Sequence, residues 1–96
     1  MKKRKRTTGA ALAAQLGLPR ARGLEAVVKA RLISAVLEEV SRQGLTHAEL
    51  ARRTRIPRSA VTGILSGSLQ RVSIDRILRL VEAVGLEAEI RVRRAA

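Results

Sequence analysis

The chain has 96 residues and a formal net charge of +12, from 20 Lys and Arg against 8 Asp and Glu. It contains no Cys, no Phe, Trp or Tyr, and a single His. These counts exclude disulfides, zinc sites and the single-strand binders that stack bases on aromatic rings, and they leave duplex DNA open as a partner. We expect one helix-rich domain with an aliphatic core, no cofactor and a polyanionic partner.

Residues 1–23 are predicted to be a flexible basic tail, separate from a folded domain at residues 24–96. The tail carries seven basic residues and no acid, with breakers at Gly9, Gly17, Pro19 and Gly23. Residues 10–16 could form two helical turns, which are marginal in water without a partner. No apolar run approaches the roughly 20 residues of a membrane span, so we expect a cytoplasmic protein without membrane contact.

A long helix is predicted from Leu24 to near Gly44. Its apolar residues recur every four positions, which is the spacing of one helix face. The stripe comprises Leu24, Val28, Leu32, Val36 and Val40, widened by Val27, Ile33 and Leu37. Gly44 is a suitable residue to end the helix.

A second, short helix is predicted to begin at Thr46. Thr46 and Glu49 have the spacing of a capping box, and Leu45 and Leu50 that of a hydrophobic staple. The helix must stop before Pro57, because a proline disfavours the α conformation of the preceding residue. A third helix is predicted from Pro57 or Arg58 to Ser66, with Gly67 ending it and three residues facing inward: Val61, Ile64 and Leu65.

A fourth helix is predicted between Ser73, its N-cap, and Gly85. Its apolar stripe consists of Ile74, Ile77, Leu78, Val81 and Val84. After Gly85, the apolar residues no longer recur with the period of a helix and instead occupy every second position. Leu86, Ala88, Ile90 and Val92 alternate with charged residues, which predicts a half-buried β-strand.

The charges of this strand are antisymmetric about Ile90. If two copies pair antiparallel with Ile90 on the two-fold axis, Glu87 meets Arg93 of the partner and Glu89 meets Arg91. The interpretation is a dimerisation strand made of Glu87, Glu89, Ile90, Arg91, Val92 and Arg93. Pairing within the same chain and a frayed end are the alternatives.

Two short helices joined by a tight turn, the second with a basic residue in its first turn, are the elements of a helix-turn-helix DNA reader. Residues 46–53 and 56–67 resemble the lambda-repressor-like (Xre-type) helix-turn-helix, with Ala51 at the helix crossing and Val61 and Ile64 as core positions. The resemblance implies a mainly α fold: a lambda-repressor-like bundle of four to five helices with one C-terminal strand, forming a homodimer. A dimer would present two recognition helices to half-sites about 34 Å apart.

Candidate DNA contacts follow from the chemistry of the second and third predicted helices. The amino end of the second helix and the residues that flank the third are suited to phosphates. The base-reading candidates are Arg58, Ser59, Thr62 and Gly63, and the phosphate candidates are Thr46, His47, Arg52, Ser66, Ser68, Gln70 and Arg71. The alternative for Arg52, Arg53 and Arg58 is an ordinary solvated face.

Residues 12–93 also resemble one branch of these proteins, the bacterial and phage antitoxins that are encoded beside RelE-like ribonuclease toxins. The resemblance rests on residues 16–19, the motif itself, residues 67–69, 73–77 and 85–92. It implies an autoregulating type II antitoxin with a RelE-like toxin partner, and toxin contacts at Leu12, Leu16 and Leu18. The sequence departs from the pattern at Arg55, where Gly is usual, at Thr54, where an aliphatic residue is expected, and at Ala13, where an aromatic residue is frequent.

Three other functions stay open: a phage-type repressor without a toxin, a nonspecific architectural DNA-binding protein, and a protein-interaction module with incidental DNA contact. An enzyme is not expected, because acids are few, Cys is missing and the single His has no evident triad.

Overall fold

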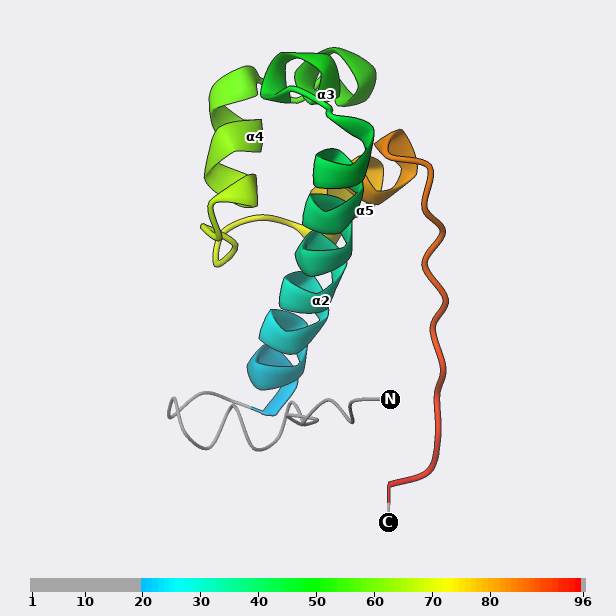
Figure 1. The fold of residues 1–96 in the computed structure, drawn as a ribbon. Helices are drawn as coiled ribbons and strands as arrows, with labels where there is room; N and C mark the ends of the chain where they lie inside the picture. The colour runs from blue at the N-terminus through cyan, green and yellow to red at the C-terminus, as the bar shows by residue number, and fades with distance from the viewer. Residues whose placement is uncertain (1–19, 96) are drawn as a thin grey trace.

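The computed structural model describes residues 20–95, and four helices lie in that range (Figure 1). Their bounds are α2, Arg20–Gln43; α3, His47–Thr54; α4, Arg58–Leu65; and α5, Ile74–Ala83. The mainly helical fold is as predicted. The expected helix at residues 10–16 and the toxin-contact candidates Leu12, Leu16 and Leu18 lie outside the described residues.

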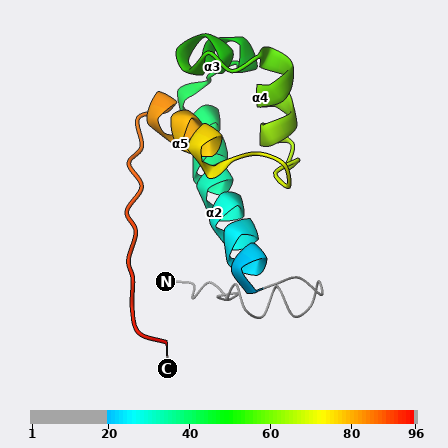
Figure 2. The same cartoon turned by 180° about the vertical axis from the view of Figure 1, so that it is seen from behind.

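Helix α2 begins at Arg20, four residues before the predicted Leu24. The expected boundary between residues 23 and 24 therefore falls within a continuous helix. Figures 1 and 2 show the amino-terminal half of α2 extending beyond the other helices. In the part of the chain that the structure describes, no helix has the length and apolar character to cross a membrane.

The core is an aliphatic cluster between α2, α3, α4 and α5. Helix α5 packs against α2 and α3, and α4 packs against α3 and α2. The inward residues predicted for α4 are confirmed, and Leu80 of α5 is a fully buried residue that the predicted stripe omitted. The buried apolar residues are Ile33, Val36, Leu50, Ile56, Val61, Ile64, Leu65, Ile77, Leu80, Val81 and Val84.

The apolar stripe predicted for α2 is wrong at two positions. Leu24 is 56% exposed and Leu37 is 41% exposed. The buried positions on α2 include the predicted Ile33 and Val36 and also Lys29, which the stripe omitted. The four-residue spacing that selected Leu24 drifts around a helix with 3.6 residues per turn, so the predicted stripe leaves the packed face over three turns.

The predicted helix caps are formed. Thr46 Oγ1 accepts a hydrogen bond from the Glu49 backbone N–H at 3.1 Å, and Ser73 Oγ accepts one from Arg76 N–H at 3.1 Å. After the last residue of α5, Ala83, and its C-cap Val84, Gly85 has φ +83° and the Leu86 N–H donates to the Val81 carbonyl at 3.0 Å. This is the Schellman arrangement, which favours glycine because it requires a left-handed residue.

The turn between α3 and α4 is left-handed at a non-glycine residue. Arg55 has φ 60° and ψ 22°, the conformation expected from its place where relatives carry Gly. The buried Thr54 side chain bridges the turn: Oγ1 donates to the Leu50 carbonyl at 2.6 Å and accepts from the Ile56 N–H at 3.2 Å. Thr54 thus satisfies backbone groups that an aliphatic residue would leave to other partners.

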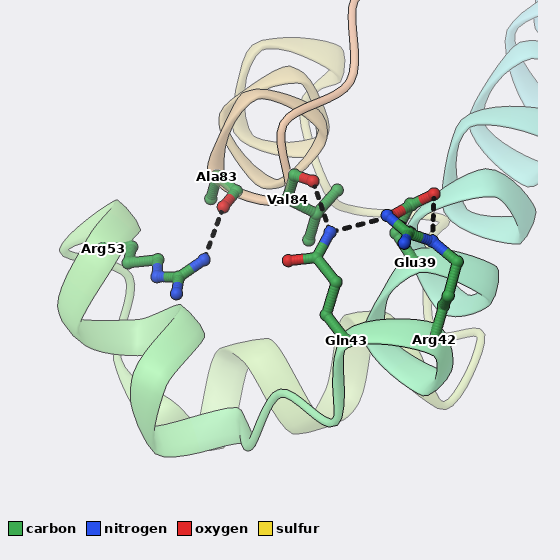
Figure 3. Close-up of polar contacts among 6 residues, drawn as sticks. All are labelled: Glu39, Arg42, Gln43, Arg53, Ala83 and Val84. Carbon is green, nitrogen blue, oxygen red and sulfur yellow. Dashed lines mark hydrogen bonds and ion pairs between the residues drawn. The ribbon is translucent and has the colours of Figure 1, made fainter.

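The carboxyl end of α5 is attached to α2 and α3 by two side chains (Figure 3). Arg53 of α3 donates to the Ala83 carbonyl at 3.0 Å, and Gln43 of α2 donates to the Val84 carbonyl at 2.8 Å. Gln43 also donates to Glu39 Oε2 at 2.7 Å. The last carbonyls of a helix have no intrahelical partner, so these two side chains supply what α5 lacks.

A buried lysine joins α2 to the loop between α4 and α5. The Lys29 side chain is 5% exposed, and its Nζ lies 2.8 Å from Glu25 Oε1 and 3.2 Å from the Leu69 carbonyl oxygen, to which it donates. A buried ammonium is costly unless it is paired and hydrogen-bonded. The Lys29 charge is therefore stabilised by one carboxylate and one backbone carbonyl, and it holds the loop against α2.

The predicted C-terminal strand is not formed in the single chain. Residues 86–95 have no regular secondary structure and extend away from the bundle (Figure 1). Ile90 is 89% exposed and Val92 is 92% exposed, and the charged candidates Glu87, Glu89, Arg91 and Arg93 are exposed as well. A strand needs backbone hydrogen bonds from a neighbour, and residues 20–95 of one chain provide no such neighbour. Pairing within the described part of the chain is therefore not observed.

Replacing Arg55 with Gly is expected to raise the free energy of unfolding by about 1 kcal/mol, because glycine adopts the left-handed conformation without a Cβ clash. Urea denaturation measures the change. Arg52→Gly removes the same charge from the interior of α3 and is expected to lower stability by about 1 kcal/mol. Equal shifts in both variants would show that charge, and not backbone conformation, determines the effect.

Glu25→Gln is expected to lower the free energy of unfolding at pH 7 by leaving Lys29 without its counter-ion. The hydrogen bond and charge of Lys29 lower the pKa of Glu25 below its ordinary value of 4.5. Since the folded pKa is depressed, the stabilisation is complete above pH 4.5 and is lost as the pH falls through the folded value. The difference between the variant and the parent should shrink on acidification. Glu38→Gln, at an exposed position on α2, is the control and should show no such convergence.

Candidate nucleic-acid interface

Helix α4 divides cleanly into a packed side and a free side. Val61, Ile64 and Leu65 are buried, whereas Arg58, Ser59 and Thr62 are exposed. Three of the four base-reading candidates therefore lie exposed on one helix of two turns. The fourth, Gly63, is half-buried, and a Cβ added there would meet nothing within 4 Å, so the backbone is open to close approach.

Arg58 occupies the first turn of α4, directly after Pro57. Pro57 has φ −54° and ψ 140° and makes no side-chain cap, so the first amides of α4 are not satisfied by its side chain. A proline at this position stiffens the entry into the helix. The guanidinium of Arg58 is exposed at the end of the helix that carries the positive end of the dipole.

The phosphate candidates of α3 have different roles in the structure. Thr46 Oγ1 accepts the capping hydrogen bond, which leaves the hydroxyl proton free to donate outward. His47 is half-buried and its Nδ1 lies 2.8 Å from Thr62 Oγ1 on α4. The structure therefore brings one phosphate candidate and one base-reading candidate into direct contact, a link the sequence pattern did not indicate.

Ser66 is constrained at the carboxyl end of α4. Its Oγ donates to the Thr62 carbonyl at 2.7 Å, so its hydroxyl proton is already used. A phosphate oxygen only accepts hydrogen bonds, and a hydroxyl must donate its proton to bind one. In this arrangement Ser66 presents only lone pairs to a phosphate.

The two neighbouring arginines of α3, Arg52 and Arg53, differ in their contacts. Both Arg52 and Arg53 are exposed, but Arg53 Nη1 is directed to the Ala83 carbonyl at the end of α5 (Figure 3). Arg53 therefore contributes to the structure of the bundle. The sequence pattern is compatible with a solvated position for Arg53. Its partner on α5 becomes apparent only from the tertiary arrangement.

A hollow of about 610 Å³ lies between the first half of α2 and the loop that follows α4. Its wall includes the phosphate candidates Ser68, Gln70 and Arg71, which are exposed. Arg22, Glu25 and Lys29 of α2 face them across the hollow. The sequence places Arg22 in the predicted tail and does not indicate that it lines the same hollow as Arg71; the signal would have been the continuation of the helix back to Arg20.

Within the helical bundle, the helix-turn-helix segment is more basic than the long helix that precedes it. Residues 46–71 carry five basic residues and one acid, whereas residues 24–45 carry three of each. Among the described residues, no group of three His, Asp or Glu side chains is placed to hold a metal ion. The electrostatic character of this surface favours an anionic polymer.

A family model described as a helix-turn-helix domain matches residues 9–93. No curated protein and no solved structure gives a significant match. The matched range includes α2, α3, α4 and α5 with the basic surface described above, and it supports a helix-turn-helix protein of the Xre-like kind. Since the match covers most of the chain, the protein belongs to the helix-turn-helix domain family.

Proposed function

We propose that the protein is a sequence-specific regulator of transcription that inserts α4 into the major groove of double-stranded DNA. The observation that carries the proposal is the free face of α4, where Arg58, Ser59 and Thr62 are exposed while the opposite face is anchored in the core. A helix held in this way has the dimensions that the major groove accommodates. Its side chains then meet base edges that differ among the four base pairs.

Arg58 is the proposed main base-reading residue. A guanidinium donates two parallel hydrogen bonds to guanine O6 and N7, and each good bidentate pair contributes about 1–3 kcal/mol of discrimination. The position at the start of α4 suits this role, because the amino-terminal residues of a recognition helix reach farthest into the groove. Ser59 and Thr62 add hydrogen-bonding groups beside it.

Phosphate contacts are proposed at two places near α4. One is Thr46 at the N-cap of α3, and the other is Arg71, which lines the hollow together with Arg22. Such contacts set the register of the protein on the duplex without carrying sequence information. Each phosphate that is neutralised makes the negative slope of log affinity against log salt steeper by about 0.9.

We further propose that the regulator is a homodimer that pairs through residues 86–93. Leu86 is packed on the core, but Ile90 and Val92 beyond it are almost fully exposed. Exposed apolar side chains on an extended, unpaired segment favour pairing with a second strand. The antisymmetric charges about Ile90 make a second copy of the same segment the matching partner.

An autoregulating antitoxin of a type II pair is the more specific proposal, and it rests on the sequence resemblance over residues 12–93. A small RelE-like reading frame beside the gene, with a toxic product that the full chain neutralises, would support it. Loss of neutralisation on removing residues 1–23, with DNA binding retained, would assign the toxin contact to that segment. DNA-dependent repression without such a neighbour would support a phage-type repressor.

Arg58→Ala is expected to reduce affinity for the preferred DNA sequence about 5- to 150-fold, which corresponds to the loss of one bidentate base contact. Affinity for unrelated duplexes should change little. The measurement is a selection from a random double-stranded library, followed by titration of the selected and scrambled duplexes at fixed salt.

Arg79→Ala is the matched control, because it removes the same charge from α5, which packs on α2 and α3 in the described chain. It should leave the preference unchanged. If Arg58→Ala and Arg79→Ala reduce affinity equally for all duplexes, the protein is a nonspecific coater and the proposed base-reading face is wrong.

Glu89→Arg and Arg91→Glu are each expected to weaken the dimer about tenfold, because each replaces two opposite-charge cross-strand pairs by like-charge pairs. The double variant restores both pairs with exchanged charges and should recover the parent dissociation constant. Sedimentation equilibrium measures all four proteins. Equal dissociation constants for the single and double variants would exclude the proposed register.

A further inference from the structure

The amino end of α3 and the free face of α4 are joined by one polar contact. His47 Nδ1 lies 2.8 Å from Thr62 Oγ1, and Thr62 is exposed on the same helix as Arg58 and Ser59. His47 precedes this face in the chain by a whole helix, so the contact depends on how α3 and α4 pack. The inference below rests on the proposed function, because it concerns what Thr62 presents to a base.

A threonine hydroxyl has one proton to donate and two lone pairs that accept. In a neutral imidazole, one ring nitrogen carries a proton and the other accepts. If Nδ1 is the acceptor, Thr62 must donate its single proton to His47, and only lone pairs point toward the DNA. If Nδ1 carries the proton, it donates to Thr62, and the hydroxyl proton is free to turn outward.

The surroundings of the imidazole favour the first arrangement in the DNA complex. Nδ1 is engaged with Thr62, which leaves Nε2 as the ring nitrogen available to a phosphate. A phosphate oxygen only accepts, so Nε2 must carry the proton when it makes this contact. In the neutral imidazole only one ring nitrogen carries a proton, so a protonated Nε2 makes Nδ1 the acceptor.

We propose that His47 is a specificity-determining positioning residue that makes Thr62 an acceptor at the base edge. The chain of donors runs from Thr62 O–H to His47 Nδ1 and from Nε2–H to a phosphate. Thr62 then accepts a hydrogen bond from an amino group in the major groove, which only adenine N6 and cytosine N4 supply. Guanine O6 and thymine O4 are acceptors and are disfavoured at this position.

The test compares base preferences of full-length variants selected on a random double-stranded library. The parent should prefer adenine or cytosine at one position, and Thr62→Val should lose that preference. His47→Ala should reduce it about fivefold to tenfold, because the hydroxyl regains freedom to donate or accept. In the double variant, His47→Ala should cause no further loss beyond that of Thr62→Val alone. Preferences at the other positions should be unchanged.

Two further variants separate positioning from a structural role. His47→Asn places an amide oxygen near the Nδ1 position and should retain the preference that His47→Ala loses. Thr62→Ser retains the hydroxyl and should retain it as well. In the free protein, Thr62→Val should shift the ¹⁵N resonance of His47 Nδ1, which a contact absent from solution would not do. Circular dichroism melting confirms that each variant is folded.

The outcomes distinguish this inference from the proposed function. A parent protein with no sequence preference overturns the function itself. A second outcome is a parent with a clear preference that His47→Ala leaves unchanged, while affinity falls uniformly and the dependence of log affinity on log salt becomes less steep. That result assigns His47 to phosphate alone and overturns the inference. A parent that prefers guanine or thymine at the Thr62-dependent position overturns the assigned direction of the hydrogen bond.

Discussion

The position of α4, the proposed recognition helix, depends on the two hydrogen bonds that Thr54 Oγ1 makes across the α3–α4 turn. One holds the last turn of α3 through the Leu50 carbonyl, and the other holds the Ile56 amide as the chain reverses through the left-handed Arg55. Leu50 and Ile56 are themselves buried, so the turn is fixed from the core as well. A strained residue persists only where its surroundings determine its conformation, and this turn provides such surroundings.

Features that depend on neighbours in sequence were predictable. The caps at Thr46 and Ser73 and the helix end at Gly85 arise from side chains and backbone groups within four residues of each other. The same holds for the division of α4 into buried and exposed sides, because helical period alone assigns it. For Arg55 the sequence left two possibilities, a left-handed residue or a rearranged turn, and the structure has the left-handed residue.

Features that depend on distant contacts were not predictable. The burial of Lys29 depends on the packing of α2 against the α4–α5 loop, whose Leu69 carbonyl lies 40 residues later in the chain. Arg53 and His47 each find their partners on other helices, at separations of 30 and 15 residues. The predicted strand fails in the single chain for a related reason: the alternating pattern describes a surface that fits a neighbour, and the described chain does not supply one.

The attachment of α5 has a consequence for the geometry of any assembly built on the C-terminal segment. Gln43 and Arg53 hold the last carbonyls of α5 against α2 and α3, directly before the chain leaves the bundle (Figure 3). The position at which the C-terminal segment leaves the bundle is therefore fixed relative to α2 and α3. The segment itself is extended and exposed. In the proposed dimer, these two side chains would help to set the spacing of the two α4 helices, and with it the separation of the half-sites along the DNA, from a helix end far from any base.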